Sequence, residues 1–172
     1  MANSNPKLPA SDAASSPAVS ENEAYQYCLG LLSRREHARR ELRHKMEKAG
    51  VNAAVIECVL ARLQADGYQC NQRFADSFTR SRIGKRHGIR KIRYELQQRG
   101  ISDDIAEATL ADYVDEELEN AQVLIKRKAP KGDIASLLDD WKQKSKVIRS
   151  LINKGYDSEV IRLAFELLAE AA

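Results

Sequence analysis

The stretch IRKIRYELQQRGISDDIAEATLADY, residues 89–113, predicts two short helices joined by a tight turn. Ile92 and Leu96 precede Gly100 at intervals of four, and apolar residues return after it at helical spacing as far as Leu110. Apolar residues that recur every three or four positions line one face of an α-helix. Gly100 therefore marks the turn between two amphipathic helices.

The same pattern occurs once upstream and once downstream. Its glycines are Gly50, Gly100 and Gly155, which lie 50 and then 55 residues apart, a period typical of repeat proteins. Each is expected just after a helix, where a positive φ costs glycine least, with an apolar residue following it. The next side chain can then accept from the first free amides of the second helix. These predicted N-caps are Asn52, Ser102 and Asp157.

The chain divides into a tail and three repeats. Residues 1–20 hold three of the four prolines and are rich in Ala and Ser, a composition typical of a disordered tail. Each helix pair has room for one more helix upstream, and Gly84 and Gly88 are expected to break the chain within the second repeat. Residues 133–140 are expected to add a short helical insertion to the third.

Each repeat is small for a core of its own, so neighbouring repeats are expected to stack. No run of residues has the composition of a β-strand. We therefore predict an all-α fold of three tandem three-helix repeats, stacked into an extended, curved helical solenoid. The predicted repeats span residues 21–70, 71–114 and 115–172.

Several classes of protein are not indicated by the sequence. No apolar run approaches the roughly 18 residues of a membrane span, and residues 1–20 lack the features of a secretion signal. Phosphate-loop, HExxH, GxSxG and dinucleotide motifs are absent. We expect a cytoplasmic protein that is not an enzyme and needs neither metal nor cofactor.

The cysteines and histidines agree with that expectation. Three cysteines without CxxC spacing argue against a disulfide framework or a zinc ribbon. Cys28 and Cys58 are interpreted as small core residues. His37 and His44 lie seven positions apart and could share a helix face, but no carboxylate or cysteine completes a ligand set.

The charge is unevenly distributed, although the net charge is only +3. Residues 71–100 carry nine Lys or Arg against two acids, whereas residues 101–120 carry eight acids and no base. For one basic residue the simplest interpretation is a solvated helix face, but three basic strips favour a surface that contacts phosphates or an acidic partner. The candidate contact residues are Arg34, Arg35, Arg39, Arg40 and Arg43; Arg80, Arg82, Lys85, Arg86, Arg90, Lys91 and Arg93; and Lys126, Arg127, Lys142, Lys144, Lys146 and Arg149.

Four segments carry a resemblance to a known family. They are REHARRELRHKMEKAGV, DGYQCNQRFADSF, GIRKIRYELQQRGIS and KSKVIRSLINKGYDSEVI. Within them the landmarks are Arg35, Glu41 and Leu42; Gly67, Tyr68, Arg73, Phe74 and Ala75; and Glu95, Leu96, Arg99, Gly100 and Ile101. Together and in this order, they resemble the RecX family, regulators of the bacterial recombinase RecA. The resemblance covers the chain from about residue 24 onward.

Two places depart from the usual pattern of that family. His37 and Ala38 stand where an aromatic residue and then Ser or Thr are usual, which removes a candidate cap. Cys70 and Asn71 replace a usual pair of aspartates. Asn71 can still cap a helix, so we expect the fold to be unaffected.

The resemblance implies a binding protein rather than an enzyme. RecX-like proteins act on the RecA filament on single-stranded DNA, lie in its helical groove and limit recombinase, ATPase and coprotease activity. For this chain we expect the same partner, with weak, non-specific DNA binding, no membrane association and a monomeric state.

Two other functions stay open at this point. The last two helices of each repeat resemble a helix-turn-helix, as in a DNA- or RNA-binding module that acts through its basic faces without RecA. Against this, Asp103, Asp104 and Glu107 would face phosphates in the second repeat. The other alternative is an interaction scaffold that contacts no nucleic acid.

Overall fold

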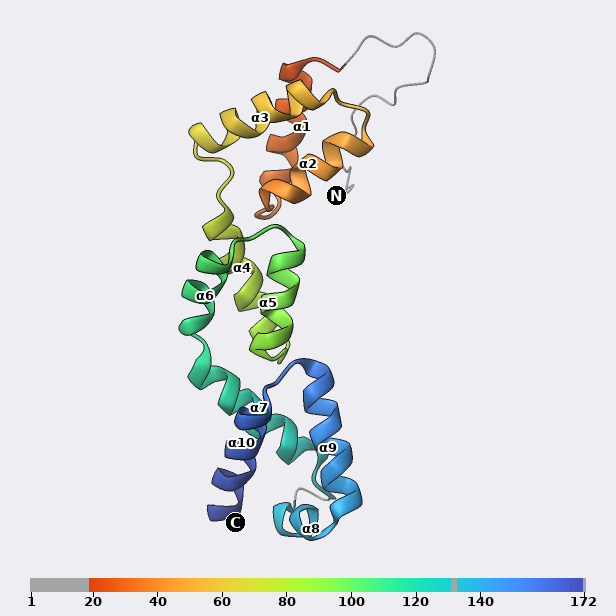
Figure 1. Cartoon of the computed structure of the whole chain (residues 1–172), viewed down its shortest axis with the longest axis vertical. Helices are drawn as coiled ribbons and strands as arrows, with labels where there is room; N and C mark the ends of the chain where they lie inside the picture. The colour runs from red at the N-terminus through yellow and green to blue at the C-terminus, as the bar shows by residue number, and fades with distance from the viewer. Residues whose placement is uncertain (1–18, 131–132, 172) are drawn as a thin grey trace. The chain divides into compact units, whose positions relative to one another are not determined.

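The computed structural model describes residues 19–130 and 133–171, and within these ranges it contains ten α-helices and no β-strand (Figure 1). The predicted all-α fold is confirmed. Of the predicted tail, residues 1–18 lie outside the described part, and Ser20 already caps the first helix. None of the described helices is long and apolar enough to cross a membrane.

The first three helices pack around one apolar core. They are α1 (Glu21–Leu32), α2 (Arg39–Lys48) and α3 (Ala53–Ala65). The side chains that recur at helical spacing point inward, as the sequence pattern predicts. The largest contributions to this core come from Leu31, Leu42, Met46, Ile56, Leu60 and Leu63.

The second triplet comprises α4 (Asn71–Gly84), α5 (Ile89–Gln98) and α6 (Asp103–Ala111). It buries Phe74, Ile83, Ile92, Leu96 and Leu110. Because α5 is short and carries many charges, only two of its side chains are fully enclosed. The remaining positions of α5 are available for contacts outside this core.

The third triplet comprises α7 (Val114–Lys128), α9 (Trp141–Lys154) and α10 (Ser158–Glu170). The predicted insertion is the short helix α8 (Ile134–Asp139), which packs against α9 and α10. Figure 1 shows α10 lying alongside α7 and α9. Their shared core is formed largely by Ile125, Leu137, Leu151, Tyr156, Ile161, Phe165 and Leu168.

By its internal contacts the described chain divides into two compact units. One comprises residues 19–77 with the turn Arg99–Ile101, and the other comprises Phe78–Gln98 with the described residues from Ser102 onward. The division passes through the second triplet, so that triplet supplies parts of both units.

The three predicted turn glycines all have positive φ. The angles are 76° at Gly50, 72° at Gly100 and 90° at Gly155. In the third turn the amide of Tyr156 donates to the carbonyl of Leu151 at 3.2 Å, which is the long hydrogen bond of a Schellman motif. The predicted turns are confirmed at all three positions, because each glycine has the positive φ that favours glycine.

The break after α4 differs from the prediction. Gly84 stays within the helix, and Arg86 has the positive φ, at 55°. The amides of Arg86 and His87 donate to the carbonyls of Ile83 and Arg82 at 2.7 and 3.1 Å, which completes a Schellman end without glycine. A side chain in this backbone region costs roughly 1–2 kcal/mol, so other contacts must hold Arg86 there.

The predicted N-caps are confirmed at two of three positions. The side chain of Asn52 accepts from the amide of Ala54 at 2.9 Å, and that of Asp157 accepts from Glu159 at 3.0 Å. Ser102 occupies the N-cap position, but its hydroxyl makes no capping hydrogen bond. Two aspartates in the first turn of α6 instead interact favourably with the positive end of the helix dipole.

Candidate partner and nucleic-acid interface

The first basic strip is largely paired with acids of its own unit. Arg35 contacts Glu41 at 3.0 Å, while Arg39 and Arg43 both contact Glu57, at 3.1 and 2.6 Å. These contacts fix Arg39 and Arg43 on the surface of α2 and Arg35 in the loop before it, and they offset much of the charge of all three. The strip therefore offers less positive potential than a count along the sequence indicates.

The rest of this strip comprises Arg34, in the loop after α1, and Arg40, in the first turn of α2. Arg34 and Arg40 are both exposed. The stem of Arg40 lies beneath Gly100, where an added Cβ would be 3.1 Å from Arg40 Cδ. Arg99, in the same turn, lies 3.5 Å from Glu41. The turn before α6 thus packs on the start of α2.

Two arginines of the middle strip are also paired. Arg93 holds Glu107 through two contacts, at 2.6 and 3.0 Å, which join α5 to α6. Arg82 Nε lies 2.8 Å from Glu95 Oε2, and the two form an ion pair but no hydrogen bond. The guanidinium of Arg82 also stacks 4.8 Å from the ring centre of Phe78. These two cations stabilise the second triplet.

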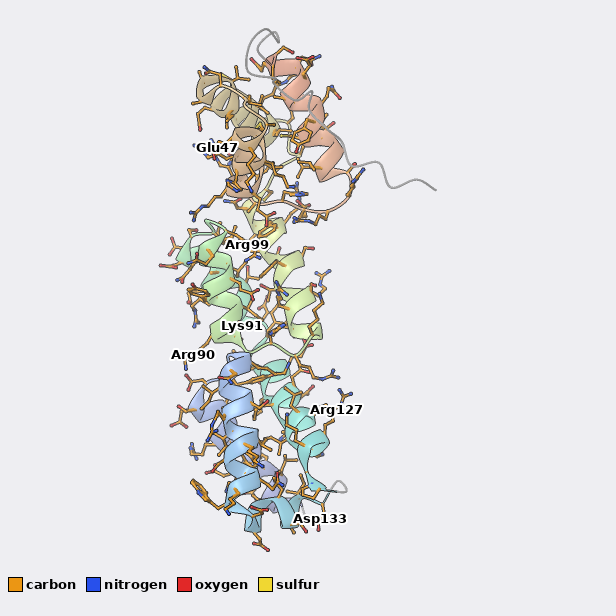
Figure 2. All side chains as sticks on the ribbon, turned by 90° about the vertical axis from the view of Figure 1, so that its right-hand side faces the viewer. Glu47, Arg90, Lys91, Arg99, Arg127 and Asp133 are labelled. Carbon is orange, nitrogen blue, oxygen red and sulfur yellow. The ribbon has the colours of Figure 1, made fainter. Side chains whose placement is uncertain are left out.

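The other five candidates of the middle strip form no ion pair with any acid of the described chain. Arg80, Lys85 and Arg90 are exposed, and Arg86 and Lys91 are half-buried. Figure 2 shows Arg90 and Lys91 side by side at the start of α5. The Nε of Arg86 is buried without a hydrogen-bond partner. Unneutralised charge therefore gathers around the loop from α4 to α5.

This loop packs tightly against the turn that precedes α10. The amide of Gly88 donates to the carbonyl of Lys154 at 2.9 Å, and a Cβ on Gly88 would overlap the backbone of Gly155. A Cβ on Gly155 would in turn overlap Lys91. The hydroxyl of Tyr156 donates to the carbonyl of Arg86 at 3.2 Å, which helps to hold that strained residue.

Side chains from the next triplet cap the start of α2 and of α5. Asn71 was expected to cap its own helix, but its Oδ1 accepts from the amide of Arg39 at 3.0 Å. Ala38, the N-cap of α2, makes no such bond itself. At the equivalent place in the other unit, Glu117 accepts from the amide of Ile89 at 2.7 Å. Sequence reasoning missed both because it assigned each cap to the nearest amides along the chain.

Two titratable groups report the electrostatics of the second unit. Burial lowers the pKa of His87, and the nearby cations Lys91, Lys154 and Arg82 lower it further. Burial also raises the pKa of Glu117, which is 4% exposed, although the hydrogen bond from Ile89 acts in the opposite direction. The loop region thus combines a neutral histidine with a positive local potential.

The third strip occupies two separate helices. Lys126 and Arg127 lie in the last turn of α7, where the helix dipole favours cations. Lys142, Lys144, Lys146 and Arg149 lie on α9, a helix that carries five cations and no acid. None of these six forms an ion pair within the described residues, and Lys144 places its ammonium 5.3 Å from the ring centre of Phe165. In Figure 2 Arg127 and Arg90 project to opposite sides.

These features define a helical-repeat protein that presents exposed cations without acidic partners on its second unit. No group of three or more His, Cys, Asp or Glu side chains in the described residues is placed to hold a metal ion. The three three-helix domains of RecX match in order: the first at residues 24–63, the second at 71–110 and the third at 115–165. The chain belongs to the RecX family.

Relatives from three bacteria are similar over most of their length. The regulatory protein RecX of Xanthomonas campestris pv. campestris (strain B100) is 35% identical over 84% of this chain and 86% of its own. That of Prosthecochloris aestuarii is 37% identical over 85% and 93%, and that of Haemophilus influenzae (strain Rd) is 33% identical over 79% and 88%.

Two solved structures share the fold. The crystal structure of RecX from Lactobacillus salivarius has a TM-score of 0.76 at 23% identity, covering 87% of this chain and 96% of that one. A second crystal structure, of a regulatory protein RecX, has a TM-score of 0.73 at 21% identity, covering 85% and 71%. At these identities the likeness concerns the fold alone.

Proposed function

We propose that this chain is a non-enzymatic, negative modulator of RecA. It binds the RecA filament on single-stranded DNA, lies in the filament groove and limits recombinase, ATPase and coprotease activity. Membership of a family whose proteins are named regulatory proteins supports a regulatory role. RecA is the partner that the resemblance implies.

The observation that carries the proposal is the gathering of unneutralised cations on the second unit. Arg90 and Lys91 at the start of α5 belong to this set, and so do Lys142, Lys146 and Arg149 on α9. A cation that is not paired with an acid of its own protein attracts the phosphates or carboxylates of a partner more strongly than a paired one does. The paired arginines of α2 take a smaller part in binding.

A second candidate function is supported by the same cations. A module that binds DNA through phosphates alone would need no RecA, and its affinity would fall steeply with salt and depend little on base sequence. A helix-turn-helix mode is disfavoured because α6 begins with two aspartates. The two candidates differ in whether RecA raises the affinity.

A gel-shift titration of the protein against labelled single-stranded DNA separates these functions. It is run with and without RecA and a slowly hydrolysed ATP analogue, at several salt concentrations. The proposal predicts much tighter binding to the RecA–DNA filament than to bare DNA. Equal affinities would support the module that acts without RecA, and binding to neither would support a scaffold with another partner.

A further inference from the structure

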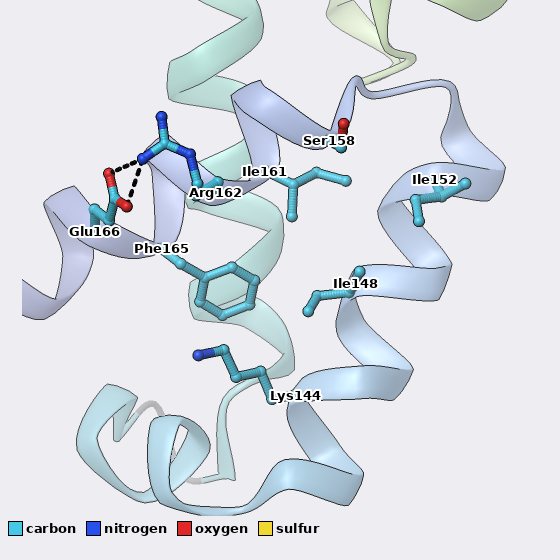
Figure 3. A pocket seen from close by; sticks show the side chains of 8 residues that line it. All are labelled: Lys144, Ile148, Ile152, Ser158, Ile161, Arg162, Phe165 and Glu166. Carbon is cyan, nitrogen blue, oxygen red and sulfur yellow. Dashed lines mark hydrogen bonds and ion pairs between the residues drawn. The ribbon is translucent and has the colours of Figure 1, made fainter.

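An apolar groove of about 300 Å³ runs between α9 and α10 (Figure 3). Ile148 and Ile152 line it from α9, and Ile161 and Phe165 line it from α10. Ile152 is 48% exposed and Ile148 is half-buried, so the groove opens to solvent on the α9 side, whereas Ile161 and Phe165 belong to the core and form its floor. The apolar surface of Ile148 and Ile152 that remains in contact with water would be stabilised by burial against a partner.

In the other two triplets an ion pair spans the corresponding two helices. In the first triplet Arg43 lies seven residues before the turn glycine, and Glu57 lies seven residues after it. In the second triplet Arg93 and Glu107 hold the same two positions. Arg43 Nη1 is 2.6 Å from Glu57 Oε1, and Arg93 Nε is 2.6 Å from Glu107 Oε1. Each pair joins the second helix of its triplet to the third.

The third triplet lacks this ion pair. The same two positions hold Ile148 and Arg162. Arg162 turns along its own helix, where it contacts Glu159 at 2.8 Å and Glu166 at 2.6 Å. No charge therefore spans the space between α9 and α10, and apolar side chains line it instead (Figure 3).

The charges around the groove differ between its two walls. On α10, Arg162 bonds to Glu166, which lines the groove with it, and also to Glu159, which lies outside the lining. The α9 wall carries only cations, with Lys144 inside the groove and Lys142 and Arg149 exposed on the same helix. An occupant that combines a bulky apolar side chain with neighbouring carboxylates would complement both features.

We propose that this groove is a protein-docking site that receives a segment of RecA bearing a bulky apolar side chain flanked by acids. The inference rests on the function proposed above and adds the chemistry of the contact. A phosphate could reach Lys144 there, but it would lose hydration against the four apolar lining residues, which favour a protein side chain instead. A buried apolar anchor with a charged rim is the usual arrangement of a binding hot spot.

The test introduces into the third triplet the ion pair that spans the second and third helices of the other two. The variant Ile148→Arg/Arg162→Glu places an arginine and a glutamate at the positions where the first two triplets hold them, so the fold has precedent within this chain. The control is Leu163→Glu, which lies on the same helix, is 40% exposed and does not line the groove. Both lower the net charge by one, and circular dichroism verifies that each is folded.

Binding is measured on RecA filaments assembled on single-stranded DNA and on the same DNA without RecA. We expect the ion-pair variant to lose filament affinity by about tenfold or more, while the control binds like wild type and bare-DNA binding is unchanged. Wild-type affinity in the folded ion-pair variant would overturn the inference. An equal loss on bare DNA would also overturn it, because the groove would then take nucleic acid.

The acidic character of the segment is tested separately with Lys144→Glu and Lys144→Gln. If the occupant carries acids, Lys144→Glu should weaken filament binding more than Lys144→Gln does. Binding to bare DNA should fall less than binding to the filament. Tighter binding by Lys144→Glu would contradict this part of the inference. If wild type itself fails to bind filaments, the proposed function is wrong. If wild type binds and the ion-pair variant binds equally well, only the docking site is wrong.

Discussion

The amide of Ile89, the first residue of α5, donates to the buried carboxylate of Glu117 on α7 at 2.7 Å. This bond satisfies a helix-end donor with a side chain that lies 28 residues away in sequence. It also joins α5, which carries Arg90 and Lys91, to α7, which carries Lys126 and Arg127. The bond therefore fixes the base on which Arg90 and Lys91 are presented.

Removal of this cap should destabilise the second unit. Glu117→Ala removes the acceptor of the partly buried Ile89 amide, which costs roughly 1–3 kcal/mol. Thermal unfolding followed by circular dichroism measures the loss, with the exposed neighbour Glu116→Ala as control. Equal unfolding temperatures for the two variants would show that the bond contributes little.

The same residue predicts a pH dependence. Because burial raises the pKa of Glu117 in the folded protein, the native state binds this proton more tightly than the unfolded chain does. Relative to Glu117→Gln, wild type should therefore gain stability as the pH falls through the folded pKa. The gain is complete below about 4.3, the usual value for Glu. A difference that grows as the pH rises would contradict the raised pKa.

Two glycines with similar backbone angles should differ in their tolerance of alanine. Gly67 has φ of 74° and nothing within 4 Å of an added Cβ, so Gly67→Ala should cost only the roughly 1–2 kcal/mol of the left-handed backbone. Gly155→Ala adds overlap with Lys91, which should cost about 1–3 kcal/mol more. Urea unfolding compares them. Equal losses would mean that the contact with Lys91 relaxes freely.

The reactivity of the cysteines follows from their burial. Burial raises the pKa of the Cys28 thiol to about 12, and that residue is fully enclosed, whereas Cys58 is exposed. A thiol reagent at pH 8 should label Cys58 rapidly and Cys28 only on unfolding, since the thiolate is the reactive form. Mass spectrometry of labelled peptides decides. Prompt labelling of Cys28 in folded protein would contradict the predicted protection.

Features that depend on neighbours in sequence were predicted well. The turn glycines follow from backbone strain and a local hydrogen-bond pattern, so Gly50, Gly100 and Gly155 could be placed from the sequence. The buried position of Cys28 was also predicted correctly. Cys58 was not, because it lies one position away from the buried face that Val59 and Leu60 occupy.

Features that depend on tertiary contacts could not be predicted in this way. The turn at Arg86 needs the hydroxyl of Tyr156, which lies 70 residues away in sequence. Arg43 on α2 pairs with Glu57 on α3, which offsets its charge. A count of basic residues along the sequence does not detect this pairing. The cap from Asn71 to α2 likewise exists only once the helices have packed.

The most direct test of the account reverses Arg90 and Lys91 together and measures RecA-catalysed, DNA-dependent ATP hydrolysis. Arg86 is left unchanged because its backbone is already strained. The control reverses Lys48 and Lys128, which change the charge equally and are exposed at the ends of α2 and α7.

Both variants should keep wild-type helix content by circular dichroism. Wild type and the control should inhibit hydrolysis, whereas Arg90→Glu/Lys91→Glu should need about tenfold or more protein for half inhibition, equivalent to roughly 1.4 kcal/mol. Full inhibition by the folded Arg90→Glu/Lys91→Glu variant at the wild-type concentration would contradict the proposed contact surface. Absence of inhibition by wild type would contradict the proposed function itself.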